Sequence, residues 1–195
     1  MQIEEHDAWS AAKKASHERI LAAAAQAIRR DGFDGSGVAE IMHAAGLTHG
    51  GFYAHFASRS AMLAEAAERA CTEGAAILEE VAGRSPPEQA LAALARAYFS
   101  QRDVPQSELK CPLVALGSEA PRQTSEIRRA ITRHIEAAIE LVARHSSDDD
   151  GRDAREHALM SVATMVGTLL LARASDDAAL SDALCDAAMR RLASI

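Results

Sequence analysis

The stretch from Ser16 to Met62 places the strongest constraint on how this chain folds. Apolar residues recur there at helical spacing in three successive segments, and Ala45-Gly46-Leu47 forms a glycine-bearing turn between the second and the third. The third segment is short and contains small residues, histidines and a tyrosine, with hydroxyl side chains nearby. This layout predicts a helix-turn-helix, whose second helix enters the major groove of DNA.

Composition and charge favour an all-α protein that binds DNA selectively. Aromatic residues make up only 4% of the 195 residues, and the long β-branched and aromatic runs that are typical of strands do not occur. The net charge is −7, but residues 8–60 carry six Lys and Arg against four Asp and Glu. A slightly basic N-terminal region on an acidic remainder fits a sequence-specific DNA-binding protein.

Helical periodicity and capping signals predict the helix boundaries. Residues 1–10 are expected to form a loose tail, and Gly32 to end the first helix as a left-handed cap. The candidate N-caps are Ser36 or Gly37, Thr48, Ser58, Ser85, and Thr124 or Ser125. The expected helices cover 11–30, 38–45, a short segment after residue 48, 58–82, 85–102, 113–119, 124–145, 152–174 and 177–193, with a polar break at 146–151.

The cysteines, histidines and hydropathy of the chain indicate a reducing compartment, no metal site and no membrane span. The three cysteines are scattered without a CxxC spacing, which argues for a reducing cytoplasm. His43, His49 and His55 lie six residues apart and do not share a helix face, so we expect no metal or cofactor. The N-terminal segment lacks the apolar core of a signal peptide. The longest apolar run, 160–172, is shorter than the roughly 20 residues of a membrane span, so no membrane association is expected.

The last two helices are apolar on more than one face. The residues responsible are Leu159, Val162, Met165, Val166, Leu169 and Leu170. Because a surface helix needs only one apolar stripe, the additional faces predict a homodimer interface. The alternative is that these helices are buried in the core of the monomer.

A set of positions between Arg19 and Leu63 forms a specific motif. Its members are Ile20-Leu21, Ala24, Gly32-Phe33, Val38, Ile41, Ala45-Gly46-Leu47-Thr48, Gly51-Phe52-Tyr53, His55-Phe56 and Ser58-Arg59. This motif resembles the DNA-binding head of the TetR family of bacterial transcriptional repressors. The resemblance implies a three-helix head over residues 1–60, a helical effector-binding and dimerisation body over 61–195, and about nine helices in all. Met42 stands where the family usually has alanine, so the second helix is expected to pack more loosely on the third.

The resemblance also implies contacts with the phosphates of a palindromic double-stranded operator. Its candidates for those contacts are Thr48, Tyr53, His55 and Arg59. The N-terminus of the third helix adds its N–H groups. Lys13 and Lys14 precede the apolar stripe of the first helix and are candidates for a flanking phosphate, or for solvated lysines.

Base edges are expected to face the first turns of the third helix. The candidates are His49, Gly50 and Phe52, although Phe52 has the alternative of packing inward, as Phe56 is expected to do. Glycine costs roughly 1 kcal/mol in a helix, so Gly50 and Gly51 favour a close approach of the backbone to DNA. The alternative is that these glycines relieve packing against the first helix.

By the same resemblance, a small apolar effector releases the repressor from its operator. The pocket is expected among the body helices and to be largely apolar. The candidates for its lining are Tyr98, Phe99, His134, Met165 and Leu169, each of which is also a candidate for the core.

Cys111 supports a second possibility, a thiol sensor. It lies between Lys110 and Pro112 at a loop-to-helix junction, and both a neighbouring cation and a helix start lower the pKa of a thiol. The segment from Cys111 to Glu119 also resembles one in a TetR subgroup that includes electrophile and oxidant sensors. Cys111 is therefore a candidate sensor of reactive chlorine, quinones or aldehydes, and the alternative is a buried, inert cysteine.

Two other protein classes are weighed against a regulator. No GxSxG, HExxH, phosphate-loop or dinucleotide motif occurs, so we do not expect an enzyme. A helical interaction module without DNA binding is the other alternative. Salt-sensitive, sequence-dependent DNA binding would distinguish a regulator from both.

Overall fold

The computed structural model describes residues 2–35, 37–105, 111–145 and 151–193, and these residues form helices but no strand. The α-helices are α1 (Gln2–Gly35), α2 (Val38–Ala44), α3 (Arg59–Gly83), α4 (Ala90–Phe99), α5 (Pro112–Leu116), α6 (Ser125–Arg144), α7 (Gly151–Ala174) and α8 (Ala178–Ala193). The described 3-10 segments are η1 (His49–Ala54), η2 (Pro87–Gln89), η3 (Ser100–Asp103) and η5 (Ala120–Arg122). The prediction of an all-α fold is confirmed.

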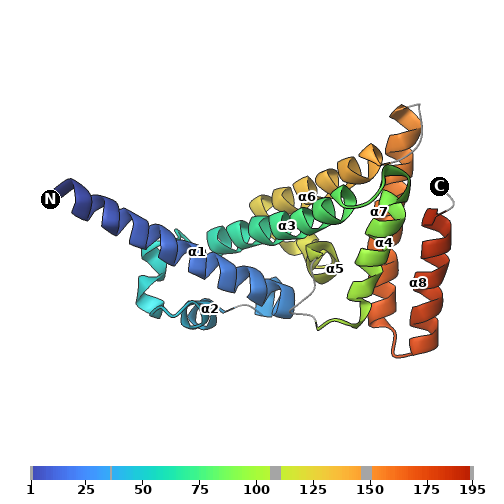
Figure 1. Cartoon of the computed structure of the whole chain (residues 1–195). Helices are drawn as coiled ribbons and strands as arrows, with labels where there is room; N and C mark the ends of the chain where they lie inside the picture. Colours follow the sequence, from blue (N-terminus) through green and yellow to red (C-terminus); the bar gives the residue numbers. More distant parts are fainter. Residues whose placement is uncertain (1, 36, 106–110, 146–150, 194–195) are drawn as a thin grey trace.

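The molecule is elongated, with different helices at its two ends (Figure 1). We call α1, α2 and η1 the head, and the helices from α3 onwards the body. α3 and α6 pack side by side along the length of the molecule, and α4, α7 and α8 pack together at the end away from the head. α5 lies against both α1 and α7, so it connects the head with the far end of the body.

The first helix is longer than predicted. α1 already begins at Gln2, so the expectation of a loose tail is wrong for residues 2–10. Residues 2–10 contain neither proline nor glycine, so the sequence has no helix breaker before residue 11. Gly32 has a φ of 74° and interrupts the helix, in line with its predicted role.

Head and body share one apolar core. Its fully buried large side chains are Ile20, Ile28, Phe33, Ile41, Met42, Met62, Leu63, Leu116 and Ile127. Phe56 is buried in the same cluster, as predicted. Because Leu116 and Ile127 belong to α5 and α6, the position of the head depends on packing against the body as well as on its own helices.

Two predicted helices of the body are divided in the structure. The segment expected at 85–102 forms η2, α4 and η3, and the one at 113–119 forms α5 followed by η5. Ser85 does not start a helix as predicted, because its Oγ donates a hydrogen bond to the carbonyl of Val81, 2.9 Å away, at the end of α3. The helices expected at 152–174 and 177–193 match α7 and α8 to within a residue.

The N-cap positions are largely those predicted, but their hydrogen bonds differ. The hydroxyl of Ser58 accepts the N–H of Ala61 at 3.1 Å and caps α3. Thr48 and Thr124 occupy N-cap positions without a side-chain capping bond. Gly37 is the N-cap of α2, while Ser36, its alternative, and most of the predicted polar break lie outside the described residues.

The apolar segment of α7 is longer than the run at residues 160–172 that the sequence analysis identified. Its residues Ala154–Ala174 reach a mean hydropathy of 1.4 and are long and apolar enough to cross a membrane. The expectation that this run is too short therefore does not hold for the whole helix, because alanines and Leu159 extend the run. Core helices of soluble proteins also pass this test, so α7 is weak support for a membrane span.

Candidate DNA-binding surface and internal cavity

The turn between α2 and η1 is a Schellman motif, which ends a helix with a residue of positive φ. Gly46 has a φ of 70°, its N–H donates to the carbonyl of His43, and the N–H of Leu47 donates to the carbonyl of Met42, both at 2.9 Å. Leu47 and Met42 both pack in the head core. The glycine-bearing turn recognised in the sequence therefore sets the angle at which η1 leaves α2.

η1 has one face in the core and one in solvent. Phe52 is only 2% exposed and stacks on Phe56 with ring centroids 5.7 Å apart. The expectation that Phe52 faces base edges is therefore corrected: it packs inward. Tyr53 is 77% exposed. Gly50, three residues before Tyr53, lies on the same face of a 3-10 helix and is also exposed.

Thr48 and His49 are exposed beside this face at the start of η1. No described residue requires glycine at positions 50 and 51. A Cβ on Gly50 would have no neighbour within 4 Å, and one on Gly51 would lie at an ordinary contact distance, 3.7 Å, from Met42 Cε. Packing against the described residues therefore does not explain these two glycines.

His55 lies between η1 and α1, next to basic residues. It borders a surface hollow together with Lys13, which is exposed, as is Lys14. Its pKa is lowered by burial and by the nearby charges of His17 and Lys13. The arrangement gathers histidine and lysine side chains from two elements on the head.

His17 is a residue that the sequence analysis missed. Its ring stacks on Phe56 with centroids 4.6 Å apart, lies 6.1 Å from the ring of His55, and its Nε2 is 2.9 Å from a carboxylate oxygen of Glu65. His17 follows Lys13 by one helical turn, and this spacing was the available signal.

Arg59 and Glu119 hold the junction between head and body. Arg59 is half-buried and donates to the carbonyl of Phe33, and the carboxylate of Glu119 accepts the N–H of Phe33 at 2.9 Å. A Cβ on Gly32 would lie 2.1 Å from Glu119 Oε1, so the carboxylate approaches the backbone closely where α1 is interrupted. Arg59, expected at a phosphate, thus has a structural contact.

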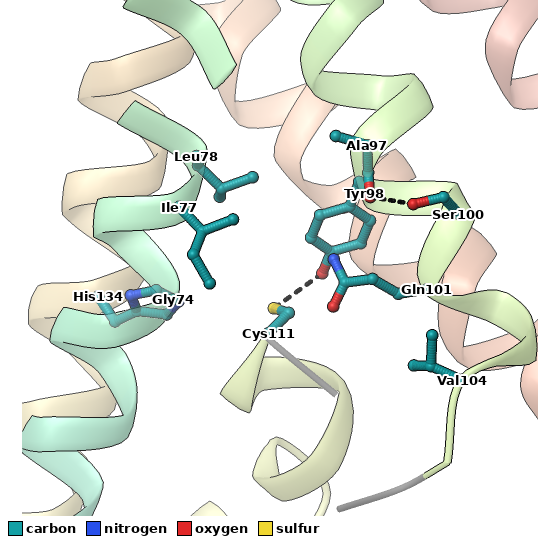
Figure 2. A pocket seen from close by; sticks show the side chains of 10 residues that line it. All are labelled: Gly74, Ile77, Leu78, Ala97, Tyr98, Ser100, Gln101, Val104, Cys111 and His134. Atoms are coloured by element: carbon teal, nitrogen blue, oxygen red, sulfur yellow. Dashed lines mark hydrogen bonds between the residues drawn. The ribbon is translucent and has the colours of Figure 1, made fainter. Parts of the chain in front are cut away.

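The body contains a cavity of about 310 Å³ between α3, α4 and α6 (Figure 2). Its lining consists of Gly74, Ile77, Leu78, Ala97, Tyr98, Ser100, Gln101, Val104, Cys111 and His134. Of the six effector candidates, the structure brings Tyr98, Cys111 and His134 together here. Met165 borders a much smaller adjoining space, while Phe99 and Leu169 are buried in the core beside it.

Arg173 of α7 forms hydrogen bonds with the backbone next to this cavity. Arg173 Nη1 donates to the carbonyls of Gln101, Arg102 and Val104 at 2.8 to 2.9 Å. Gln101 and Val104 line the cavity, so these hydrogen bonds fix two lining residues to α7.

Comparison with known proteins identifies the family. Residues 20–66 match the family described as bacterial regulatory proteins, tetR family. An uncharacterized HTH-type transcriptional regulator of Mycobacterium tuberculosis is 28% identical over 168 residues, which cover 82% of this chain and 85% of that protein. The chain is a TetR-family transcriptional regulator. The family consists of DNA-binding regulators, which are not enzymes.

Solved TetR-family structures share the fold over nearly the whole chain. Escherichia coli NemR in its reduced form has a TM-score of 0.78 at 21% identity, covering 92% of this chain and 96% of that chain. A TetR-family regulator of Cytophaga hutchinsonii has a TM-score of 0.78 at 19% identity, covering 94% and 96%. At these identities the likeness shows the fold of head and body together.

Within this TetR-family chain, the pKa of the Cys111 thiol is shifted in the direction opposite to that expected. Its Sγ accepts a hydrogen bond from the hydroxyl of Tyr98 at 2.9 Å, as Figure 2 shows. Burial raises the pKa of the Cys111 thiol, although the bond from Tyr98 acts in the opposite direction. The predicted lowering of this pKa is therefore wrong, because burial outweighs the helix start; Lys110 lies outside the described residues.

The last two helices of the TetR-family chain are only partly buried. Val162, Met165 and Leu169, three of the six apolar residues named for these helices, are in the core of the protomer. Large apolar side chains remain exposed on these helices: Leu159, Met160, Leu170 and Leu171 of α7 and Leu180 of α8. Met160 is 62% and Leu171 54% exposed.

Proposed function

We propose that this TetR-family regulator is a cytoplasmic repressor that binds a palindromic operator as a homodimer and leaves it when a small molecule occupies the body. The observation that carries the proposal is the exposed face of η1, with Gly50 and Tyr53 beside Thr48 and His49 at the end of a Schellman turn. Residues 1–60 act as the DNA-binding head and residues 61–195 as the effector-binding and dimerisation body.

The head residues divide by the part of DNA that they contact. Thr48, Tyr53 and His55 bind phosphates, with Lys13, Lys14 and Arg59 adding positive charge at the edges of the surface. His49 and the backbone at Gly50 approach base edges, since no side chain at residue 50 holds the backbone away.

Dimerisation follows from the apolar side chains that α7 and α8 leave exposed. Several large apolar side chains exposed on two packed helices favour an interface with another protomer. Pairing two copies through these helices presents two heads, and two heads recognise half-sites about one DNA turn apart or a multiple of it. A palindromic operator is therefore expected only if the protein is a dimer.

Release is explained by the contact between α5 and the head. Cys111, at the start of α5, lines the cavity, and Glu119, just after α5, binds the N–H of Phe33. A ligand that displaces the start of α5 also displaces Glu119 and thereby the end of α1. The resulting shift of one head relative to the other weakens simultaneous binding of both half-sites.

The test is selection of bound sequences from random DNA by the purified full chain, followed by a gel shift with the recovered site. We expect a palindrome, and we expect Tyr53→Ala to weaken binding at least tenfold, about the value of one charge-assisted hydrogen bond. Ala39→Ser changes an exposed residue of α2 and serves as the control for overall integrity. Recovery of no enriched sequence, or unchanged binding by Tyr53→Ala, would contradict the proposal.

A thiol-sensing function is the second candidate, because Cys111 lines the cavity and contacts Tyr98. A Michael acceptor would bond to Sγ while the thiol proton passes to its α-carbon, so no oxidant is needed. Mass spectrometry after treatment with N-ethylmaleimide tests this function, with Cys71 and Cys185 as internal controls. Preferential adduct formation at Cys111 together with loss of DNA binding supports it, and equal or slower labelling of Cys111 rules it out.

A further inference from the structure

The cavity contains polar atoms but no charged side chain among its described lining residues. Aspartate, glutamate, lysine and arginine are all absent from that lining. Its titratable groups are held uncharged: burial raises the pKa of Tyr98 and of Cys111 and lowers the pKa of His134. An ion entering the cavity would therefore lose water without gaining a counter-charge from these described lining residues.

One hydroxyl in the cavity is positioned to bind a ligand. Tyr98 donates to the sulfur of Cys111, and a thiol sulfur is a weak acceptor. A ligand oxygen near the same position offers a better acceptor to this buried O–H. The exchange leaves no strong hydrogen bond broken, because only the O–H···S contact is given up.

His134 adds a second polar group on the opposite side. It comes from α6, is 5% exposed, and its ring makes no hydrogen bond with another described residue. Figure 2 shows it across the cavity from Tyr98, beside Gly74 of α3. A neutral imidazole presents one N–H donor and one acceptor nitrogen, so the ring can bind a neutral polar group.

The volume limits the size of the ligand. An apolar cavity of roughly 150 Å³ accepts benzene, and ordinary ligand pockets begin at roughly 300 Å³. A cavity of about 310 Å³ therefore accommodates a single ring with one substituent or a short branched chain.

From these observations we propose that the effector is a compact, uncharged organic molecule with one carbonyl-type oxygen that accepts the hydrogen bond of Tyr98. The inference rests on the proposed effector function and specifies the chemical class that this site binds. It gives Tyr98 the role of selecting the ligand and leaves Cys111 as a weak acceptor that the ligand replaces.

Four ligands of nearly equal shape test the proposal by calorimetric titration of the full chain at neutral pH. Acetophenone is neutral with a carbonyl oxygen, α-methylstyrene is neutral without one, benzoate is an anion and benzamidinium is a cation. We expect acetophenone to bind about tenfold more tightly than α-methylstyrene, the value of one buried hydrogen bond. We expect benzoate and benzamidinium to bind at least about 100-fold more weakly, because neither gains a counter-charge.

Two matched variants separate ligand selection from folding. Tyr98→Phe should remove the preference for acetophenone over α-methylstyrene while leaving α-methylstyrene binding unchanged. Tyr53→Phe makes the same change on the exposed face of η1, outside the cavity, and should leave both affinities as in the wild type. A thermal melt of each variant shows whether it is folded.

Several outcomes overturn the proposal: a charged compound that binds as tightly as acetophenone, no binding of either neutral compound at millimolar concentration, or an unchanged preference in Tyr98→Phe. These measurements need no DNA, so they are independent of the proposed repressor function. Acetophenone binding without any effect on operator binding would keep the ligand class and contradict effector release instead.

Discussion

Gly32 has an unusual backbone conformation and lies next to Glu119, which joins the head to the body. Its φ of 74° with ψ of −177° lies in a region that is essentially restricted to glycine. We expect Gly32→Ala to lower the free energy of unfolding by about 1–3 kcal/mol through backbone strain. Urea denaturation measures this loss.

Gly83→Ala is the matched control, because Gly83 ends a helix with nothing within 4 Å of an added Cβ and no positive φ. It should be neutral or slightly stabilising. The added Cβ also displaces the carboxylate of Glu119, which weakens its hydrogen bond with the N–H of Phe33 and adds to the cost of Gly32→Ala. Equal stability of the two variants would show that backbone strain at residue 32 is not significant.

His134 makes stability depend on pH. Burial lowers its pKa in the folded state from 6.5, so below that pH the unfolded chain binds more protons than the folded chain. The free energy of unfolding should therefore fall as the pH falls from about 6.5 towards the folded-state pKa of His134. Urea titrations at neutral and mildly acidic pH measure this slope.

His134→Gln should reduce this decrease, because glutamine does not titrate. His43→Gln makes the same substitution on the exposed side of α2 and serves as the control. A wild-type slope retained in His134→Gln would assign the pH dependence to other groups.

At the scale of elements, alanine substitutions at two N-cap residues should affect different properties, one protein stability and the other operator binding. Ser58 accepts the N–H of Ala61 and caps α3, whereas Thr48 starts η1 without such a bond. We expect Ser58→Ala to cost about 1 kcal/mol of stability and Thr48→Ala to cost little. We expect Thr48→Ala to weaken operator binding instead, because its hydroxyl is free for a phosphate. Thermal melts and gel shifts of both variants check this pair, and a clear loss of stability in Thr48→Ala would contradict it.

Local sequence signals predicted the elements well where the chain itself determines them. Gly46 forms the turn because a glycine after a short helix adopts positive φ readily, and Ser58 caps α3 through a hydrogen bond within four residues. The bounds of α7 and α8 follow in the same way from polar breaks. These features need no knowledge of distant contacts.

The sequence could not predict features that depend on packing between distant segments. Phe52 packs inward because its ring stacks on Phe56 in a core that also contains residues of α1 and α3. Burial at Cys111 reverses the predicted direction of its pKa shift, and the contact between Glu119 and Phe33 joins residues 86 positions apart. Helical periodicity contains no information on these contacts.

At the scale of the whole molecule, the exposed apolar side chains of α7 and α8 predict assembly. Leu171→Glu places a charge in this patch, so we expect a monomer in sedimentation velocity and loss of tight operator binding. Ala76→Glu, at an exposed position of α3, is the control and should remain dimeric. A dimeric Leu171→Glu protein would place the interface elsewhere.

The three hydrogen bonds of Arg173 connect the cavity lining to α7, which also carries part of the proposed dimer interface. The helix that carries Met160 and Leu171 on its outer side also fixes Gln101 and Val104 at the cavity rim. Any movement of α7 against its neighbours therefore moves two residues of the cavity lining. If the proposed dimer forms through α7, the dependence is mutual: a compound that prefers one placement of α7 would shift the monomer–dimer equilibrium, and protein concentration would alter the apparent affinity for that compound.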